Sequence, residues 1–227
     1  MVINLKKIFL AIILMLIAGC TQAKDFKYGA KQISDLNSKH NTTMETSPSD
    51  IQKINAMIAD FKELRKIKLD KGREAFNYVV DYRILNLEAE KFYIQGQEYG
   101  LAGTTKSGFG CKQRPLIIES VALRNSSALK GFNAVDLLRE FVDKYQAESN
   151  FANLSYKNAL FLNATFYQIS TDAGFDSDII NSFCPSNTTL EIYKEQFRKE
   201  TNLSEEFINN LTYEEAVGIW KNLEGIN

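Results

Sequence analysis

The chain of 227 residues contains a single histidine, His40, which lies close to its N-terminus. A Ser-His-Asp triad and a Cys-His dyad need a histidine as general base, and many zinc sites take histidine ligands. Because His40 precedes the main apolar part of the chain, the sequence disfavours these three kinds of site, and we expect no metal and no cofactor. A mechanism built on carboxylates alone stays open, since glycosidases need only two acids at a suitable separation.

Glu119 is the candidate for such an acid. It directly follows the apolar residues Leu116, Ile117 and Ile118, and a carboxyl partly buried beside apolar side chains has a raised pKa. An acid in the first turns of a helix is also an ordinary partner of the helix dipole. Both interpretations remain, and Glu119 is the one catalytic candidate.

The N-terminal twenty residues are typical of an export signal. Lys6 and Lys7 precede an apolar run from Ile8 to Ile17, which is shorter than the roughly 20 residues needed to span a bilayer. Ile17-Ala18-Gly19-Cys20 resembles the lipobox of bacterial lipoproteins. The resemblance covers only this segment, and it implies cleavage before Cys20, lipidation of Cys20 and attachment to a membrane. Thr21 follows the cysteine instead of aspartate, which by the same resemblance implies the outer membrane in an organism that has one, with the body facing the periplasm or the cell surface.

Cys111 and Cys184 are then the only other cysteines of an exported chain. Two thiols in an oxidising compartment are usually paired, so the sequence predicts a disulfide between them. Closing a loop of this length would stabilise the fold by roughly 4 kcal/mol in the chain-entropy model. A nucleophilic role for Cys111 is not supported, because the only histidine, His40, lies outside the body of the protein.

The segment from Gly96 to Pro115 contains four glycines after its first residue and predicts a long loop within the body. Loops of this length are either functional or disordered. The segment has no phosphate-loop pattern, because no Gly-Lys-Ser/Thr opens a helix after a strand. As a binding loop it would offer Tyr99, Lys106 and Phe109; the alternative is a connector held by the disulfide.

Charge and composition limit the partners of the mature chain. Removing residues 1–19 takes away two lysines and no acidic residue, so the formal charge changes from −1 to −3. A mildly acidic, well-mixed chain lacks the basic face that nucleic-acid binding requires. Residues 20–49 are rich in Lys, Ser, Asn and Thr, and they predict a flexible tether of roughly 30 Å after the lipidated cysteine. Residues 50–227 then form one domain.

Apolar periodicity predicts that this domain is mainly α, with about seven to nine helices. Residues 74–94 and 154–169 are apolar on most sides, which is typical of buried helices, so we expect them to be two central helices. Asp50, Asn133, Ser204 and Thr212 are expected N-caps, the last within a capping box. Thr188 or Thr189 is expected to open a further helix.

The sequence favours a non-enzymatic envelope lipoprotein that binds another protein, as an adaptor, an assembly factor, or an immunity or exclusion factor. The evidence is the implied anchor together with few catalytic groups. Two alternatives remain open. One is a cell-wall hydrolase that uses carboxylates, and the other is a binder of a small apolar or lipid ligand.

Overall fold

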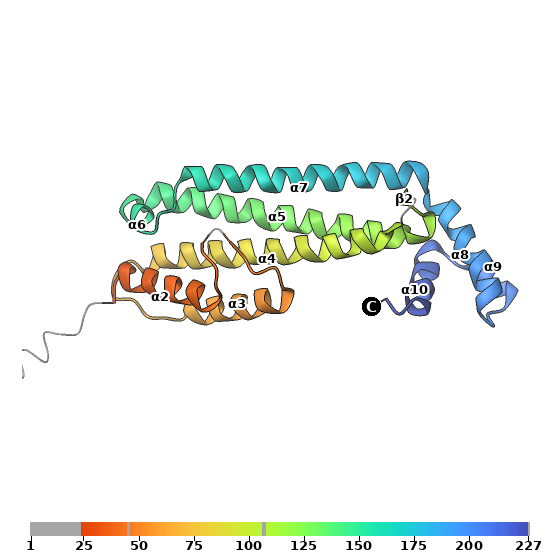
Figure 1. The fold of residues 1–227 in the computed structure, drawn as a ribbon, viewed down its shortest axis with the longest axis horizontal. Coiled ribbons are helices and arrows are strands. Elements are labelled where there is room, and N and C mark those ends of the chain that lie inside the picture. The colour runs from red at the N-terminus through yellow and green to blue at the C-terminus, as the bar shows by residue number, and fades with distance from the viewer. Residues whose placement is uncertain (1–23, 45, 106–107, 227) are drawn as a thin grey trace, which may run out of the picture.

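The computed structural model describes residues 24–44, 46–105 and 108–226, and the implied signal and lipobox lie outside this range. Three long helices run side by side along the molecule (Figure 1). They are α4 (Arg73–Gly103), α5 (Arg114–Lys144) and α7 (Tyr156–Phe183). α5 lies in the middle and packs against α4 on one side and α7 on the other. The expectation of a mainly α domain with central packed helices is confirmed.

Shorter helices cover the two ends of this bundle (Figure 1). α2 (Phe26–Lys39) and α3 (Ile51–Leu64) pack against the first half of α4, and α6 (Gln146–Phe151) joins α5 to α7. α8 (Ser186–Glu200), α9 (Glu205–Asn210) and α10 (Tyr213–Leu223) gather at the far end. Between α4 and α5, the two-residue strands β1 (Thr104–Thr105) and β2 (Gly108–Phe109) pair antiparallel and lead into the 3-10 turn η1 (Cys111–Gln113).

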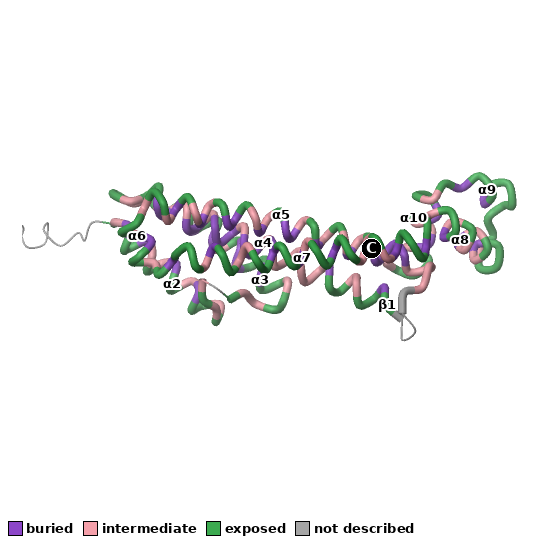
Figure 2. Tube along the Cα trace, turned by 90° about the horizontal axis from the view of Figure 1, so that it is seen from above, coloured by how far each residue is buried: buried purple, intermediate pink, exposed green. Residues whose placement is uncertain are grey.

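The buried apolar side chains form a large core and a smaller one. The large core lies between α2, α3, α4, α5 and α7 and includes Phe61, Phe76 and Phe141. The smaller core joins α8, α9 and α10 to the start of α5 and is built around Tyr193, Phe197 and Trp220. Figure 2 shows the buried residues concentrated where the helices face one another. Arg114 links the two regions, because its guanidinium donates to Tyr213 Oη at 2.6 Å and to Asn181 Oδ1 at 2.9 Å.

The expected tether over residues 20–49 is wrong for most of its length. Its residues 26–39 form α2, in which Phe26 and Ile33 are buried in the large core. His40, placed in the tether by the sequence, has its Nε2 2.9 Å from Asp60 Oδ2 on α3. The following loop is also held down, since the buried Arg83 guanidinium donates to the carbonyl of Met44 at 3.2 Å and to that of Thr46.

The expected long loop over residues 96–115 is also wrong. α4 continues to Gly103 and α5 starts at Arg114, so only a short hairpin and a turn separate the helices. Gly96, Gly100 and Gly103 lie on the side of α4 that meets α5, whereas Gly108 and Gly110 lie in the connection between the two helices. A Cβ added at Gly96 would lie 2.8 Å from Arg124 Cγ, and one at Gly103 would lie 2.4 Å from Ile117 Cδ1. The glycines of α4 therefore permit close helix packing and do not mark a loop.

Two smaller expectations about helices need correction. Asn133 does not start a helix, because α5 runs without a break from Arg114 to Lys144. α8 begins at Ser186, directly after Pro185, and not at Thr188 or Thr189. The caps at Asp50, Ser204 and Thr212 are confirmed by side-chain oxygens that accept from Lys53, Phe207 and Glu215 backbone N–H groups.

Candidate protein-interaction face

The structure confirms the disulfide. Cys111 Sγ and Cys184 Sγ are bonded, and the bridge ties η1 at the start of α5 to the end of α7. Ile117 and Ile180 pack beside it, and Cys184 is buried. The bridge is therefore built into the junction between the bundle and the C-terminal helices. Its position explains both cysteines as structural residues.

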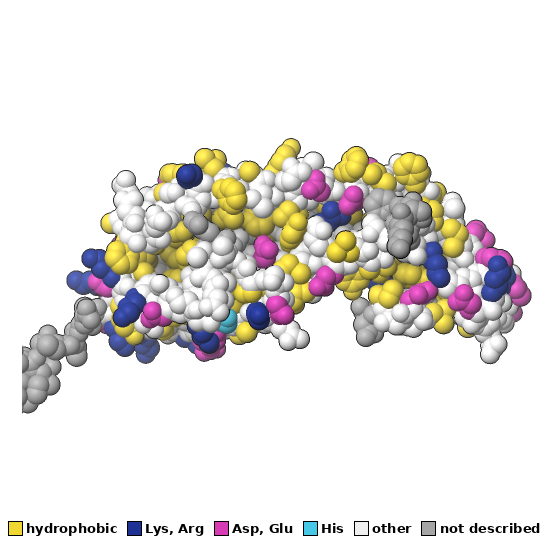
Figure 3. Space-filling model, in the orientation of Figure 1, with side chains coloured by type: hydrophobic (Ala, Val, Ile, Leu, Met, Phe, Trp, Pro, Cys, Tyr) yellow, Lys and Arg dark blue, Asp and Glu magenta, His cyan; other side chains and the backbone are white. Residues whose placement is uncertain are grey.

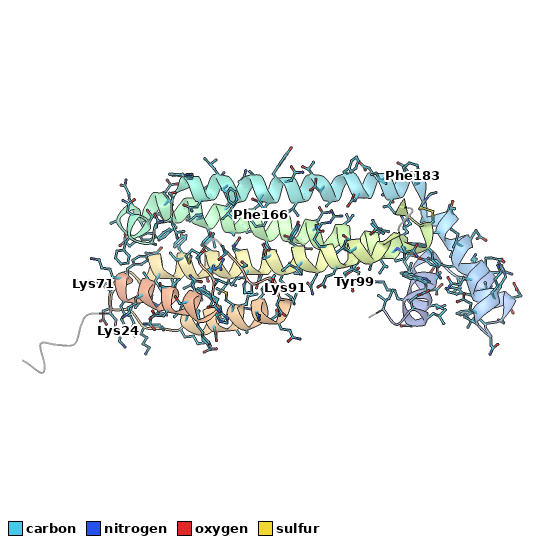
Figure 4. All side chains as sticks on the ribbon, in the orientation of Figure 1. Lys24, Lys71, Lys91, Tyr99, Phe166 and Phe183 are labelled. Carbon is cyan, nitrogen blue, oxygen red and sulfur yellow. A yellow bond between two sulfur atoms is a disulfide. The ribbon has the colours of Figure 1, made fainter. Side chains whose placement is uncertain are left out.

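The proposed binding-loop residues do not form one site. Tyr99 lies within α4, half-buried, and packs against the small core of the C-terminal helices (Figure 4). Lys106 lies outside the described residues, and for Phe109 only the backbone, in β2, is described. Cys20, the predicted lipidation site, also lies outside the described range.

Glu119 is a surface residue of α5. Its side chain is 42% exposed, and Oε2 lies 3.9 Å from Lys221 Nζ on α10. The structure thus gives it a solvent-facing position beside a cation, and not the dry pocket that would make a carboxyl a general acid. Among residues 24–44, 46–105 and 108–226, no group of three or more His, Cys, Asp and Glu side chains is arranged to hold a metal ion.

The outward side of α7 carries several large apolar side chains that are exposed to solvent. Its inward side packs through residues spaced three, four or seven apart: Ala159, Phe166, Ile169, Ala173 and Ile180. Its outward side carries Leu160, Tyr167 and Phe175, whose exposed fractions are 63%, 67% and 65%. Phe161, on the flank, is 73% exposed. We call these four residues the α7 face.

Charge is scarce on this helix. No charged residue occurs between Lys157 and Asp172, so the α7 face is not interrupted by a charged side chain along its first half. Apolar side chains gather along the upper edge of the molecule, over α7, in Figure 3. A single exposed apolar residue is ordinary, but a row of them on one helix is typical of a binding surface.

A groove of about 780 Å³ lies beside the α7 face, between α4 and α7. Phe161, Phe166 and Ile169 contribute apolar walls, while Asn86 and Glu90 bring polar groups from α4. Burial raises the pKa of Glu90, and the Arg83 charge opposes this only in part. The groove therefore combines an apolar wall on α7 with many polar and charged groups, Gln97 and Arg124 among them. An apolar wall beside hydrogen-bonding groups can receive an anchoring side chain or a small ligand.

The sequence predicted that residues 154–169 form a buried central helix. Phe166 fits that prediction, since it is 3% exposed, and Figure 4 shows it between α5 and α7. Leu160, Phe161 and Tyr167 do not fit it. The segment is thus an outer helix with two apolar sides, and α5 takes the second central position. The sequence does show that both sides of this helix lack charged residues. It does not show which of the two sides packs against another helix.

No helix in the described part of the chain is both long enough and apolar enough to cross a bilayer. Comparison of the chain with protein-family models, with curated proteins and with solved structures finds no match.

Proposed function

We propose that this protein is a lipid-anchored helical module of the cell envelope that binds another protein through the α7 face. The exposed apolar row on α7 is the observation that carries the proposal. Three of its residues, Leu160, Tyr167 and Phe175, are at least 63% exposed although they are large and apolar. A partner that covered this row would gain about 25 cal/mol of favourable free energy for each Å² of apolar surface removed from water.

The geometry of α7 suits recognition of an elongated partner. A helix of 28 residues is roughly 42 Å long, and α7 lies at the outer edge of the bundle (Figure 1). A partner helix or strand that lies along it would also meet the groove at Phe161. Central apolar anchors that enter a pocket provide most of the binding energy in protein interfaces.

The membrane attachment rests on the resemblance of residues 17–20 to a lipobox. Two or more acyl chains on Cys20 would hold the protein firmly at the membrane surface, because each buried CH₂ contributes about 0.8 kcal/mol. In this proposal the body stays outside the cytoplasm, in the periplasm or at the cell surface. The protein acts as an adaptor, an assembly factor, or an immunity or exclusion factor.

Site-specific photocrosslinking in intact cells tests this proposal. A benzoylphenylalanine placed at Tyr167 should give one discrete adduct with a partner protein, and the further change Phe175→Ser should weaken it. The matched control is the same probe at Leu101 on α4, which is 72% exposed but lies away from the α7 face. Equal adducts from both positions, or none from Tyr167, would contradict binding through α7.

The anchor is tested in the same cells. A fatty-acid analogue should label the wild type and not the Cys20→Ala variant. The Tyr167 adduct should also decrease in that variant, because the protein is no longer held at the membrane close to its partner. Label that persists in Cys20→Ala would contradict lipidation of this cysteine.

The groove between α4 and α7 favours a second candidate function, the binding of a small ligand with an apolar body. Native mass spectrometry of protein purified from cells would reveal such a ligand. In that case Phe161→Ser should lose it, whereas Leu101→Ser should keep it.

A further inference from the structure

One end of the molecule carries a group of cations that form no ion pair within the described part of the chain. It consists of Lys24, Lys27, Lys31, Lys68, Lys71 and Arg73, which we call the basic end. All six side chains are exposed, and none forms an ion pair with another described residue. They come from two segments: Lys24 precedes α2 and Lys27 and Lys31 lie in its first half, whereas Lys68 and Lys71 lie in the loop between α3 and α4 and Arg73 is the first residue of α4.

Backbone contacts bring these two segments together. The Lys24 backbone N–H donates to Asp70 Oδ2 at 3.0 Å, and the Asp70 N–H donates to the Lys24 carbonyl at 2.7 Å. Gly72 adopts a φ of +71°, where a Cβ would lie 2.8 Å from Phe26 Cβ. The lysines of both segments therefore share one surface, and Figure 4 shows Lys24 and Lys71 at the same end of the molecule.

Exposed aromatic rings lie among these cations. Lys27 Nζ lies 5.6 Å from the centre of the Phe151 ring, and Lys24 Nζ lies 5.7 Å from that of Tyr28. Phe151 is 52% exposed and Tyr28 is 36% exposed. Aromatic rings beside lysines are enriched where proteins meet the interface of a bilayer, because the ring enters the headgroup region while the ammonium meets phosphate.

Few carboxylates oppose the basic end. Those nearby in the chain and the fold are Asp25, Asp35, Asp70, Glu74 and Glu148. Asp25 and Asp70 each accept a backbone N–H, from Tyr28 and from Lys24. At the opposite end of the molecule, residues 191–224 contain four Lys and Arg against eight Glu. Basic side chains are visible at the α2 end of Figure 3, and acidic ones at the α8–α10 end.

The chain length before α2 places the basic end near the proposed anchor. Only four residue steps separate Cys20 from Lys24, and four extended residues span at most about 14 Å. A lipid on Cys20 would thus keep the basic end within reach of the headgroups. We infer that the basic end binds an anionic phospholipid bilayer, with the acidic C-terminal helices directed away from it. This orientation rests on the lipid anchor of the proposed function. The affinity of the basic end for anionic lipid does not depend on that anchor.

Vesicle co-sedimentation tests the inference without the anchor. The protein used is the mature chain from residue 20 with Cys20→Ser, which retains every described residue. Vesicles of phosphatidylcholine containing about one quarter phosphatidylglycerol should bind it, and pure phosphatidylcholine vesicles should not. Binding should fall at least about tenfold between roughly 50 mM and 300 mM NaCl, because salt screens such contacts.

Charge reversal at the basic end supplies the decisive comparison. Lys68→Glu with Lys71→Glu should lower the partition onto anionic vesicles by about tenfold or more, since each lysine near an anionic surface contributes to binding. The matched control, Lys91→Glu with Lys199→Glu, makes the same change of net charge on the middle of α4 and on α8 and should change the partition less than about twofold. Circular dichroism confirms that both variants are folded.

Three results would overturn the inference: no binding to anionic vesicles, equal binding to neutral vesicles, or an equal loss in the control variant. Failure of the proposed protein binding is a separate result, because Phe175→Ser should weaken the adduct formed by the probe at position 167 and leave the vesicle partition unchanged. Failure of the anchor is separate as well, since it appears only in the fatty-acid labelling of Cys20.

Discussion

Gly131 and Gly174 differ in the space that an added Cβ atom would find around it. A Cβ at Gly131 of α5 would lie 2.2 Å from Cγ of Phe166, whose ring packs against this position from α7. A Cβ at Gly174 of α7 would meet no atom within 4 Å. Both residues lie within helices, so alanine would favour the helical backbone equally in each, and the contact with Phe166 makes the difference.

We predict opposite effects of alanine at these two positions. Gly131→Ala should lower the free energy of unfolding, since overpacking costs about 1–3 kcal/mol and the helix propensity of alanine returns only about 1 kcal/mol. Gly174→Ala should raise it, by up to about 1 kcal/mol. Urea unfolding followed by circular dichroism measures both, and equal stability of the two variants would contradict the close packing of α5 on α7.

The helices differ in how much of them could be predicted from the sequence. The caps at Asp50, Ser204 and Thr212 were predicted correctly because their hydrogen bonds span three residues and depend on nothing distant. α2 was missed although Phe26, Ala30 and Ile33 repeat at helical spacing, because polar residues dominate the rest of the segment. The glycines of α4 were misinterpreted because their role depends on a close approach of α5, which no local pattern reports.

Neighbouring residues of α7 provide a test of its two sides. Phe166 is 3% exposed and Tyr167 is 67% exposed. Phe166→Ala should lower the free energy of unfolding by about 3–5 kcal/mol, as removal of a core ring does, whereas Tyr167→Ala should change it by less than about 0.5 kcal/mol. Urea denaturation of both variants checks this. A large loss for Tyr167→Ala would mean that the α7 face is covered within the protein itself.

On the scale of the whole molecule, the smaller core lies at one end of the bundle and is built onto the end of α4 and the start of α5. The C-terminal helices meet the bundle through the apolar packing of Leu116 and Tyr99 in the smaller core and through the hydrogen bond from Arg114 to Tyr213. The Tyr193 hydroxyl also donates to the Lys112 carbonyl at 3.1 Å, and the disulfide holds η1 to the end of α7, next to the start of α8. The sequence predicted the disulfide and the helical class, but not that residues 186–226 form a separate cluster at the end of the bundle. That division arises from the direction in which α8 leaves α7, which composition does not encode.

Removing the disulfide should therefore affect the whole molecule. Cys111→Ser with Cys184→Ser is expected to lower the free energy of unfolding by about 2–4 kcal/mol, measured by thermal unfolding. Reductant should shift the melting temperature of the wild type to that of the double variant and leave the variant unchanged. Identical melting of the oxidised wild type and the variant would show that the bridge does not contribute to stability.

The same bridge has a consequence for proteolysis. It joins the residues just before α5 and just after α7, so α5, α6 and α7 lie within one covalently closed ring of the chain. The turn at α6, which includes the exposed residues Gln146, Ala147 and Asn150, is an accessible place for a protease to cut. A single cut there would open the ring without releasing either piece, and the C-terminal helices would stay attached to the N-terminal part of the chain.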